Sequence, residues 1–177
     1  MRRTALILAA IASPLFAQQQ QSAPAANVSV NAAKSIWQIS SGFVVRSAEQ
    51  MPESLFNFRP TPAVRSFGQI VAHVADAQYL FCSAALGEKA PVTGSFEKDA
   101  TTKAAIVKAI KDATAYCERA YAQNDAQSAD AITLFGQMQT TRLGSLIMNA
   151  AHDYEHYGNL VTYFRLKGMT PPSSQGM

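Results

Sequence analysis

The sequence lacks both a long apolar run and a block of basic residues. The apolar run Ala5 to Ile11 is far shorter than the ~20 residues that a membrane-spanning helix needs, and Pro14 follows it closely. Lys and Arg form no basic stripe, although the formal net charge is +3. We therefore expect no membrane and no nucleic acid among the partners.

The N-terminus has the pattern of a secretory signal peptide. Arg2 and Arg3 precede the short apolar run, and a polar tract begins at Gln18. We expect cleavage after Ala17, although Leu15 occupies a position where a small residue is preferred. Cleavage would remove two of the 15 basic residues and leave 13 against 12 acidic ones, so the basic character says little about partners. The prediction is a periplasmic or secreted protein with residues 1–17 removed.

Histidine and cysteine are scarce, with three and two residues respectively. His152 and His156 lie four apart in a helical stretch, so both project from one face of a helix and can reach a single ion. His73, the third histidine, lies in another helical stretch. Three histidines would leave a coordination position open, which is typical of catalytic metal sites. The alternative is that each histidine is an ordinary core or surface residue, because spacing alone does not bring His73 to the pair.

Periodicity predicts four amphipathic helices and an all-α fold. We expect them near residues 32–50, 66–86, 101–124 and 140–167. A proline-rich packed connection covers 52–62, a long loop covers 87–100, and an irregular stretch at 125–139 includes a short extended piece at 131–135. A four-helix bundle over 31–170 follows, with a flexible leader at 18–30 and a tail at 171–177.

Local signals indicate helix ends and buried faces. Ser66 and Gln69 form a capping box at the start of the second helix, and Gly87 ends it. We expect apolar residues at helical spacing to face the core. In the first helix these are Ile36, Ile39 and Phe43, with Trp37 as a further candidate, and in the last they include Leu143, Ile147, Ala150, Tyr154, Val161 and Phe164.

Two segments resemble the DinB-like superfamily. They are PESLFNFRPTP at 52–62 with RSFGQ at 65–69, and HYGNLVTYFR at 156–165. The resemblance extends over residues 31–173 and implies an up-down-down-up four-helix bundle with long crossover loops. It also implies a divalent metal ion, zinc or nickel, bound by His73, His152 and His156. Related activities include transferases and isomerases that depend on thiols such as bacillithiol or mycothiol. Those thiols are cytosolic, so the predicted export argues against a thiol-transferase role.

Other residues near the histidines have competing interpretations. His152 to His156 also fits H-x-x-E-H, a metalloprotease pattern in which Glu155 would be the general base, but the chain after His156 is too short for that scaffold. We expect Glu155 to be a solvated carboxylate outside the metal's ligands, and we interpret Asp76 and Asp153 with the same caution. Asn159 and Tyr163 share the histidine face of the last helix and are candidate pocket residues.

Cys82 and Cys117 predict how the second and third helices run. Each lies at the same distance from its proposed helix start, at Ser66 and Thr101, so parallel helices would bring the two sulfurs level. The loop at 87–100 is long enough to return the chain along a helix, and the resemblance points the same way. We predict parallel helices and a Cys82–Cys117 disulfide; two buried free thiols are the alternative.

The sequence therefore favours an exported metal-binding protein. The expected activity is metal-assisted hydrolysis or group transfer on a small molecule, with the catalytic residues unassigned. The alternative is a non-enzymatic metal or small-ligand binding protein. A small molecule is the expected partner, and a second copy of the chain is a candidate one.

Overall fold

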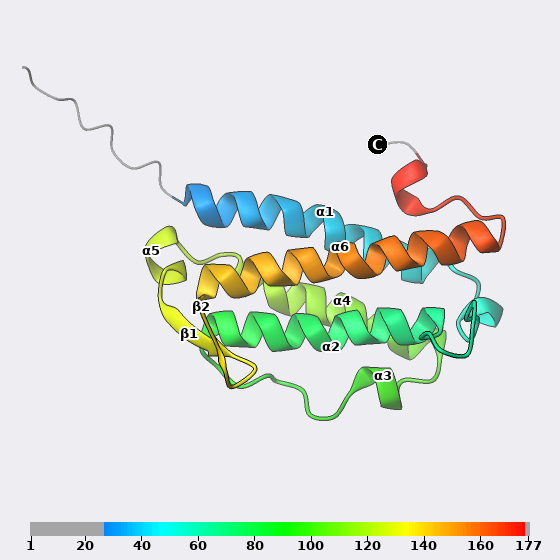
Figure 1. Cartoon of the computed structure of the whole chain (residues 1–177), viewed down its shortest axis with the longest axis horizontal. Helices are drawn as coiled ribbons and strands as arrows, with labels where there is room; N and C mark the ends of the chain where they lie inside the picture. Colours follow the sequence, from blue (N-terminus) through cyan, green and yellow to red (C-terminus); the bar gives the residue numbers. More distant parts are fainter. Residues whose placement is uncertain (1–26, 176–177) are drawn as a thin grey trace, which may run out of the picture.

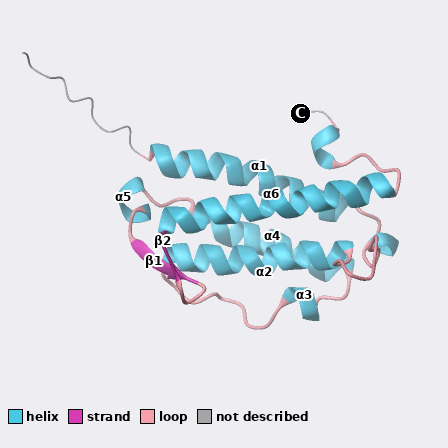
Figure 2. Ribbon diagram, viewed as in Figure 1, coloured by secondary structure: helices cyan, strands magenta, loops and turns pink. Residues whose placement is uncertain are grey.

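The computed structural model describes residues 27–175 and is mostly helical. Four long helices lie alongside one another (Figure 1): α1 (Val28–Gln50), α2 (Phe67–Leu86), α4 (Lys103–Ala120) and α6 (Arg142–Leu166). The shorter elements are η1 (Glu53–Leu55), α3 (Phe96–Asp99), α5 (Asp125–Ser128), β1 (Ala131–Leu134), β2 (Met138–Thr141) and η2 (Pro172–Ser174) (Figure 2). Helices α1 and α2 each pack against both α4 and α6. The predicted signal peptide lies outside the described residues.

The ends of α2 are set by local sequence, as predicted. The Ser66 hydroxyl accepts a hydrogen bond from the Gln69 backbone N–H, and the Gln69 side chain accepts one from the Ser66 backbone N–H. Gly87 ends the helix in the left-handed region at φ 70°, which glycine adopts without steric cost. The capping box and the glycine stop are confirmed.

The start of α1 differs from the prediction. The helix begins at Val28 rather than near Ala32, because its first turn is capped from a distant part of the chain. The Asp125 carboxylate accepts hydrogen bonds from the backbone N–H groups of Ser29 (3.1 Å) and Val30 (2.9 Å). Helix starts need such acceptors for their free N–H groups. Residues 28–30, expected in a flexible leader, are therefore helical.

The buried face of α1 also differs from the prediction. Trp37 is fully buried and stacks on Tyr121 with ring centroids 4.3 Å apart, whereas Ile36 and Ile39 are about half exposed, at 51% and 49%. The face that packs inward carries mostly small residues besides Trp37: Val30, Ala33, Ser40, Ser41, Val44, Ser47 and Ala48. Small side chains let the helix approach its neighbours closely, so the larger isoleucines remain outside.

On α6 the predicted core residues divide in a similar way. Ala150 and Phe164 are buried, but Ile147 and Tyr154 are exposed at 52% and 40%. Buried polar residues such as Ser145 and Asn149 occupy part of the inward face instead. Apolar character alone therefore does not define the inward face of this helix.

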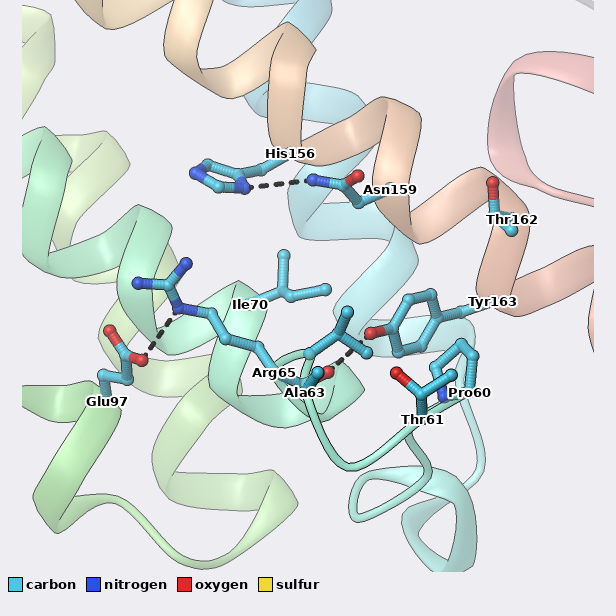
Figure 3. A pocket seen from close by; sticks show the side chains of 11 residues that line it. Pro60, Thr61, Ala63, Arg65, Ile70, Glu97, His156, Asn159, Thr162 and Tyr163 are labelled. Carbon is cyan, nitrogen blue, oxygen red and sulfur yellow. Dashed lines mark hydrogen bonds and ion pairs between the residues drawn. The ribbon is translucent and has the colours of Figure 1, made fainter.

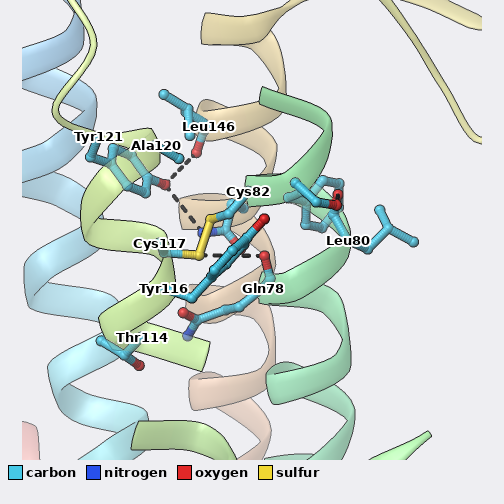
Figure 4. The surroundings of a disulfide bond; sticks show 12 residues. Gln78, Leu80, Cys82, Thr114, Tyr116, Cys117, Ala120, Tyr121 and Leu146 are labelled. Atoms are coloured by element: carbon cyan, nitrogen blue, oxygen red, sulfur yellow. Dashed lines mark hydrogen bonds between the residues drawn. A yellow bond between two sulfur atoms is a disulfide. The ribbon is translucent and has the colours of Figure 1, made fainter. Parts of the chain in front are cut away.

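Helices α2 and α4 contact each other at corresponding ends. Near their starts, a Cβ atom on Gly68 would lie only 3.1 Å from the Ile106 side chain. Near their ends, Cys82 and Cys117 form a disulfide with Cα atoms 5.3 Å apart (Figure 4). The two helices therefore run in the same direction, and the predicted disulfide is confirmed.

The connections contain more regular structure than the sequence predicted. The segment 87–100, expected to be a loop, includes the short helix α3. The expected extended piece near 131–135 is strand β1, which pairs antiparallel with β2 across a turn where Phe135 and Gly136 have positive φ. The fold is therefore mostly helical with one hairpin, rather than strictly all-α. Within residues 27–175, none of the helices combines the length and apolar character needed to span a bilayer.

Candidate metal centre

The three histidines of the sequence meet at one place in the fold. His73 comes from α2, and His152 and His156 come from successive turns of α6. The Nε2 atom of His152 lies 3.2 Å from that of His73 and 3.1 Å from that of His156. One ligand atom from each residue lies within 4.8 Å of the others. The structure thus brings together the residues that the sequence singled out.

Neighbouring groups orient the histidine rings. The Nδ1 atom of His73 lies 3.0 Å from Oε2 of Glu97. A carboxylate oxygen accepts, so this Nδ1 carries the hydrogen and Nε2 presents its lone pair to the other histidines. The Asn159 side-chain amide lies 3.4 Å from Nδ1 of His156 and orients that ring more weakly. Carboxylates that fix a histidine in this way are typical neighbours of metal sites.

Burial keeps the histidines of α6 neutral. The pKa of His152 is lowered from 6.5 to about 3. Burial is the largest cause, and the charges of His156, His73 and Arg65 act in the same direction. Burial, followed by the charge of His73, also lowers the pKa of His156. Neutral imidazoles keep the lone pairs that a cation needs.

The geometry fits a divalent ion. A tetrahedral zinc ion about 2.0–2.1 Å from each ligand nitrogen holds those nitrogens roughly 3.4 Å apart. The Nε2 atom of His152 lies 3.2 Å from that of His73 and 3.1 Å from that of His156, close to that value. The residues could therefore hold a metal ion after a small adjustment of the rings. The second nitrogen of His152, Nδ1, is buried without a hydrogen-bond partner among the described residues.

Asp76 places Glu97 beside His73. Its carboxylate accepts hydrogen bonds from the Ser95 hydroxyl (2.7 Å) and from the backbone N–H groups of Phe96 (2.8 Å) and Glu97 (3.1 Å). These bonds satisfy the free N–H groups of the first turn of α3. Asp76 thereby attaches α3 to α2, one turn after His73. Sequence reasoning missed Glu97, because its segment was expected to be a loop.

Glu97 is itself held at both oxygens. Oε1 accepts from Nε of Arg65 at 2.8 Å, while Oε2 faces His73. Burial raises the pKa of Glu97, but the hydrogen bond and charge of Arg65 and the proximity of His73 outweigh it, so the net pKa is lowered. The carboxylate therefore stays ionised and can orient the His73 ring.

A cavity of about 620 Å³ adjoins the histidines. His156, Glu97, Arg65, Asn159 and Tyr163 are part of its wall (Figure 3). The remaining lining residues are Pro60, Thr61, Ala63, Val64, Ile70 and Thr162. The predictions that Asn159 and Tyr163 are pocket residues are confirmed. This size and mixture of apolar and polar walls is typical of small-molecule sites.

The other two acidic candidates lie away from the histidine nitrogens. Glu155 is exposed on the outer side of α6. Asp153 is fully buried, where one oxygen accepts from the Gln78 amide at 3.4 Å and the other has no partner among the described residues. Burial raises the pKa of Asp153 well above its ordinary value. Among the acidic residues considered, Glu97 is the one that contacts a histidine of the cluster.

The chain is thus a helical protein with a three-histidine candidate metal centre. It belongs to the DinB superfamily, whose family model matches residues 44–160. The resemblance found in the sequence is therefore confirmed. No curated protein matches the chain in sequence.

Solved structures share the fold at low identity. A DinB-like protein from Bacillus cereus superposes with a TM-score of 0.70 at 13% identity, covering 80% of this chain and 95% of that one. A conserved protein from Enterococcus faecalis gives 0.62 at 16% identity, covering 77% and 95%. The mycothiol-dependent maleylpyruvate isomerase gives 0.59 at 13% identity, covering 74% of this chain and 60% of the isomerase. These likenesses show the fold.

Proposed function

We propose that the protein binds a divalent metal ion, zinc or nickel, through His73, His152 and His156 and acts on a small molecule in the adjoining cavity. The observation that carries the proposal is the convergence of three Nε2 atoms beside a cavity that His156 also lines. When bound, the ion would act as a Lewis acid toward an oxygen or sulfur atom. We infer hydrolysis or group transfer as the reaction class.

The chain's own residues would prepare the site for this chemistry. Glu97 holds His73 in the tautomer that presents Nε2. Burial keeps His152 and His156 without protons that would compete with the ion. The apolar part of the cavity wall, which includes Ile70, would exclude water from one side of a bound molecule.

A non-enzymatic metal or ligand binder is the alternative function. Such a protein needs only an enclosed ion, whereas here a cavity of about 620 Å³ reaches one of the candidate ligands, His156. Room for a small molecule beside the ion favours a reaction over storage.

We further propose that the protein is exported. The Cys82–Cys117 disulfide supports this, because disulfides persist in oxidising compartments. The structural neighbour named as mycothiol-dependent is an isomerase, but in an oxidising compartment we favour a reaction that uses no cytosolic thiol. Mass spectrometry of protein from its native host should find a mature N-terminus near Gln18. An intact N-terminus in the cytosolic fraction would overturn the export proposal.

We also infer the up-down-down-up order for the four long helices. The start-to-start contact of Gly68 with Ile106 and the end-to-end disulfide support parallel α2 and α4. The crossover that contains α3 is long enough to return the chain between them.

Metal content measured on purified variants tests the proposed site. Single changes His73→Ala, His152→Ala and His156→Ala should each remove most bound metal in elemental analysis, while far-ultraviolet circular dichroism still shows a helical protein. Glu155→Gln is the matched control, because this exposed residue lies on α6 between two of the histidines. Full metal content in any histidine variant would remove that residue from the ligand set.

A further inference from the structure

The guanidinium of Arg65 is fixed at the wall of the cavity. Its Nε donates to Oε1 of Glu97 at 2.8 Å, and the backbone carbonyl of Arg65 accepts a hydrogen bond from the Tyr163 hydroxyl. The next residue, Ser66, caps α2. Backbone and side chain are thus both held, so an incoming ligand would meet an arginine that is already oriented.

The free edge of this guanidinium faces the cavity. Of its five N–H donors, the one on Nε is used, and the two terminal nitrogens donate to no residue in the described part of the chain. Figure 3 shows the guanidinium between Glu97 and His156, with one terminal nitrogen directed toward His156. Two parallel donors in a rigid fork match the two oxygens of a carboxylate.

The polar groups of the wall can accommodate an anion. Glu97 is the one acidic residue that lines the cavity, and its two oxygens already contact Arg65 and His73. The other polar wall residues, such as Asn159 and Thr162, are neutral. An anionic group beside Arg65 would therefore meet unused donors and no unpaired carboxylate.

The position of Arg65 also relates such an anion to the histidines. The Glu97 carboxylate that contacts Nε of Arg65 at 2.8 Å also contacts Nδ1 of His73 at 3.0 Å, so Arg65 lies one side chain away from the histidine cluster. Ile70 and Val64 offer an apolar surface in the same cavity. A small molecule with one anionic end could bind Arg65 and place its body along this surface, next to the histidine cluster.

We propose that Arg65 determines specificity by binding the carboxylate of a small organic acid in this cavity. This inference rests on the proposed function and names its substrate class. Benzoate and its neutral isostere benzamide are suitable probes, measured by calorimetry on metal-free protein at neutral pH. Wild type should bind benzoate at least tenfold more tightly than benzamide, and Arg65→Gln should weaken benzoate binding about tenfold or more. Benzamide binding should not change.

A further variant separates direct recognition by Arg65 from a general effect of positive charge. Arg59→Gln removes a nearby positive charge that does not line the cavity and should leave benzoate binding within about twofold of wild type. Thermal unfolding of each variant checks that it is folded.

The proposal is overturned if Arg65→Gln binds benzoate like wild type, or if Arg59→Gln loses as much affinity as Arg65→Gln. Equal binding of benzoate and benzamide by wild type, or binding of neither, also overturns it. Because the probes are applied to metal-free protein, these results are independent of metal binding. Failure of the histidine variants to lose metal would contradict the proposed function without changing the result for Arg65.

Discussion

Replacing Asp76 by alanine would test whether the short helix α3 controls metal affinity. The carboxylate accepts three hydrogen bonds, two of them from backbone N–H groups in the first turn of α3. Without it, Glu97 is held mainly by Arg65, a partly exposed ion pair worth about 0–1 kcal/mol. That is too little to keep four residues of helix ordered, so we expect Glu97 to leave His73.

The expected loss of affinity follows from the role of Glu97. Residues that orient a metal-binding histidine typically contribute a factor of ~10–100 in metal affinity. A factor of ten corresponds to about 1.4 kcal/mol. We therefore expect Asp76→Ala to bind zinc about ten times more weakly than wild type, in competition titrations against a chromophoric chelator at neutral pH. Asp99→Ala is the matched control, because it removes an acidic residue of α3 that does not contact His73.

A double-mutant cycle gives the sharpest result. If Asp76 acts through Glu97, the double variant Asp76→Ala/Glu97→Gln should bind zinc no more weakly than Glu97→Gln alone. Additive losses would refute the reasoning, because Asp76 would then act on the site by another route. An effect of Asp99→Ala as large as that of Asp76→Ala would refute it as well.

Three other predictions concern stability. The double variant Cys82→Ala/Cys117→Ala removes the disulfide, which closes a loop of 35 residues. It should lower the free energy of unfolding by roughly 4 kcal/mol in urea titrations. An unchanged free energy of unfolding would contradict a structural role for the disulfide. Metal-free protein should lose about 1 kcal/mol between pH 7 and pH 5 through His152, a value already reduced for the ring's partial exposure. Stability falls with pH because His152 takes up a proton below pH 6.5 in the unfolded state, whereas in the folded state its pKa is about 3. A His152→Gln variant should therefore lose less stability over the same pH range. Gly68→Ala should destabilise the fold by about 1 kcal/mol, because the added Cβ would lie 3.2 Å from the backbone oxygen of Phe56. Helix propensity alone would make this change stabilising. A gain in stability would therefore show that the backbone moves to admit the Cβ.

Features with local causes could be predicted from the sequence. The capping box at Ser66 depends on two side chains three residues apart, and the His152–His156 pair depends on one helical turn. The disulfide followed from two equal distances along helices, once the helices were taken as parallel. The first two inferences used spacing within a helix, which sequence shows directly. The disulfide also needed the parallel direction of the two helices, which the length of the loop at 87–100 and the family resemblance indicated.

Features with distant causes could not be predicted in this way. The first turn of α1 depends on Asp125, which lies 95 residues away from Val30 in the chain. Helix α3 depends on Asp76, which sits in another element, so its sequence looks like an ordinary loop. The inward face of α1 was misplaced because small residues fit against α6 better than Ile36 and Ile39 do.

The distant cap of α1 has a consequence for the order of folding. Contacts between residues far apart in the chain form only after the intervening chain is organised, because their loop-closure entropy must be paid first. The first turn of α1 should thus be completed after the segment around α5 has folded, although it lies much earlier in the sequence. Hydrogen exchange at the amide protons of Ser29 and Val30 would then report on the docking of α5 against the start of α1.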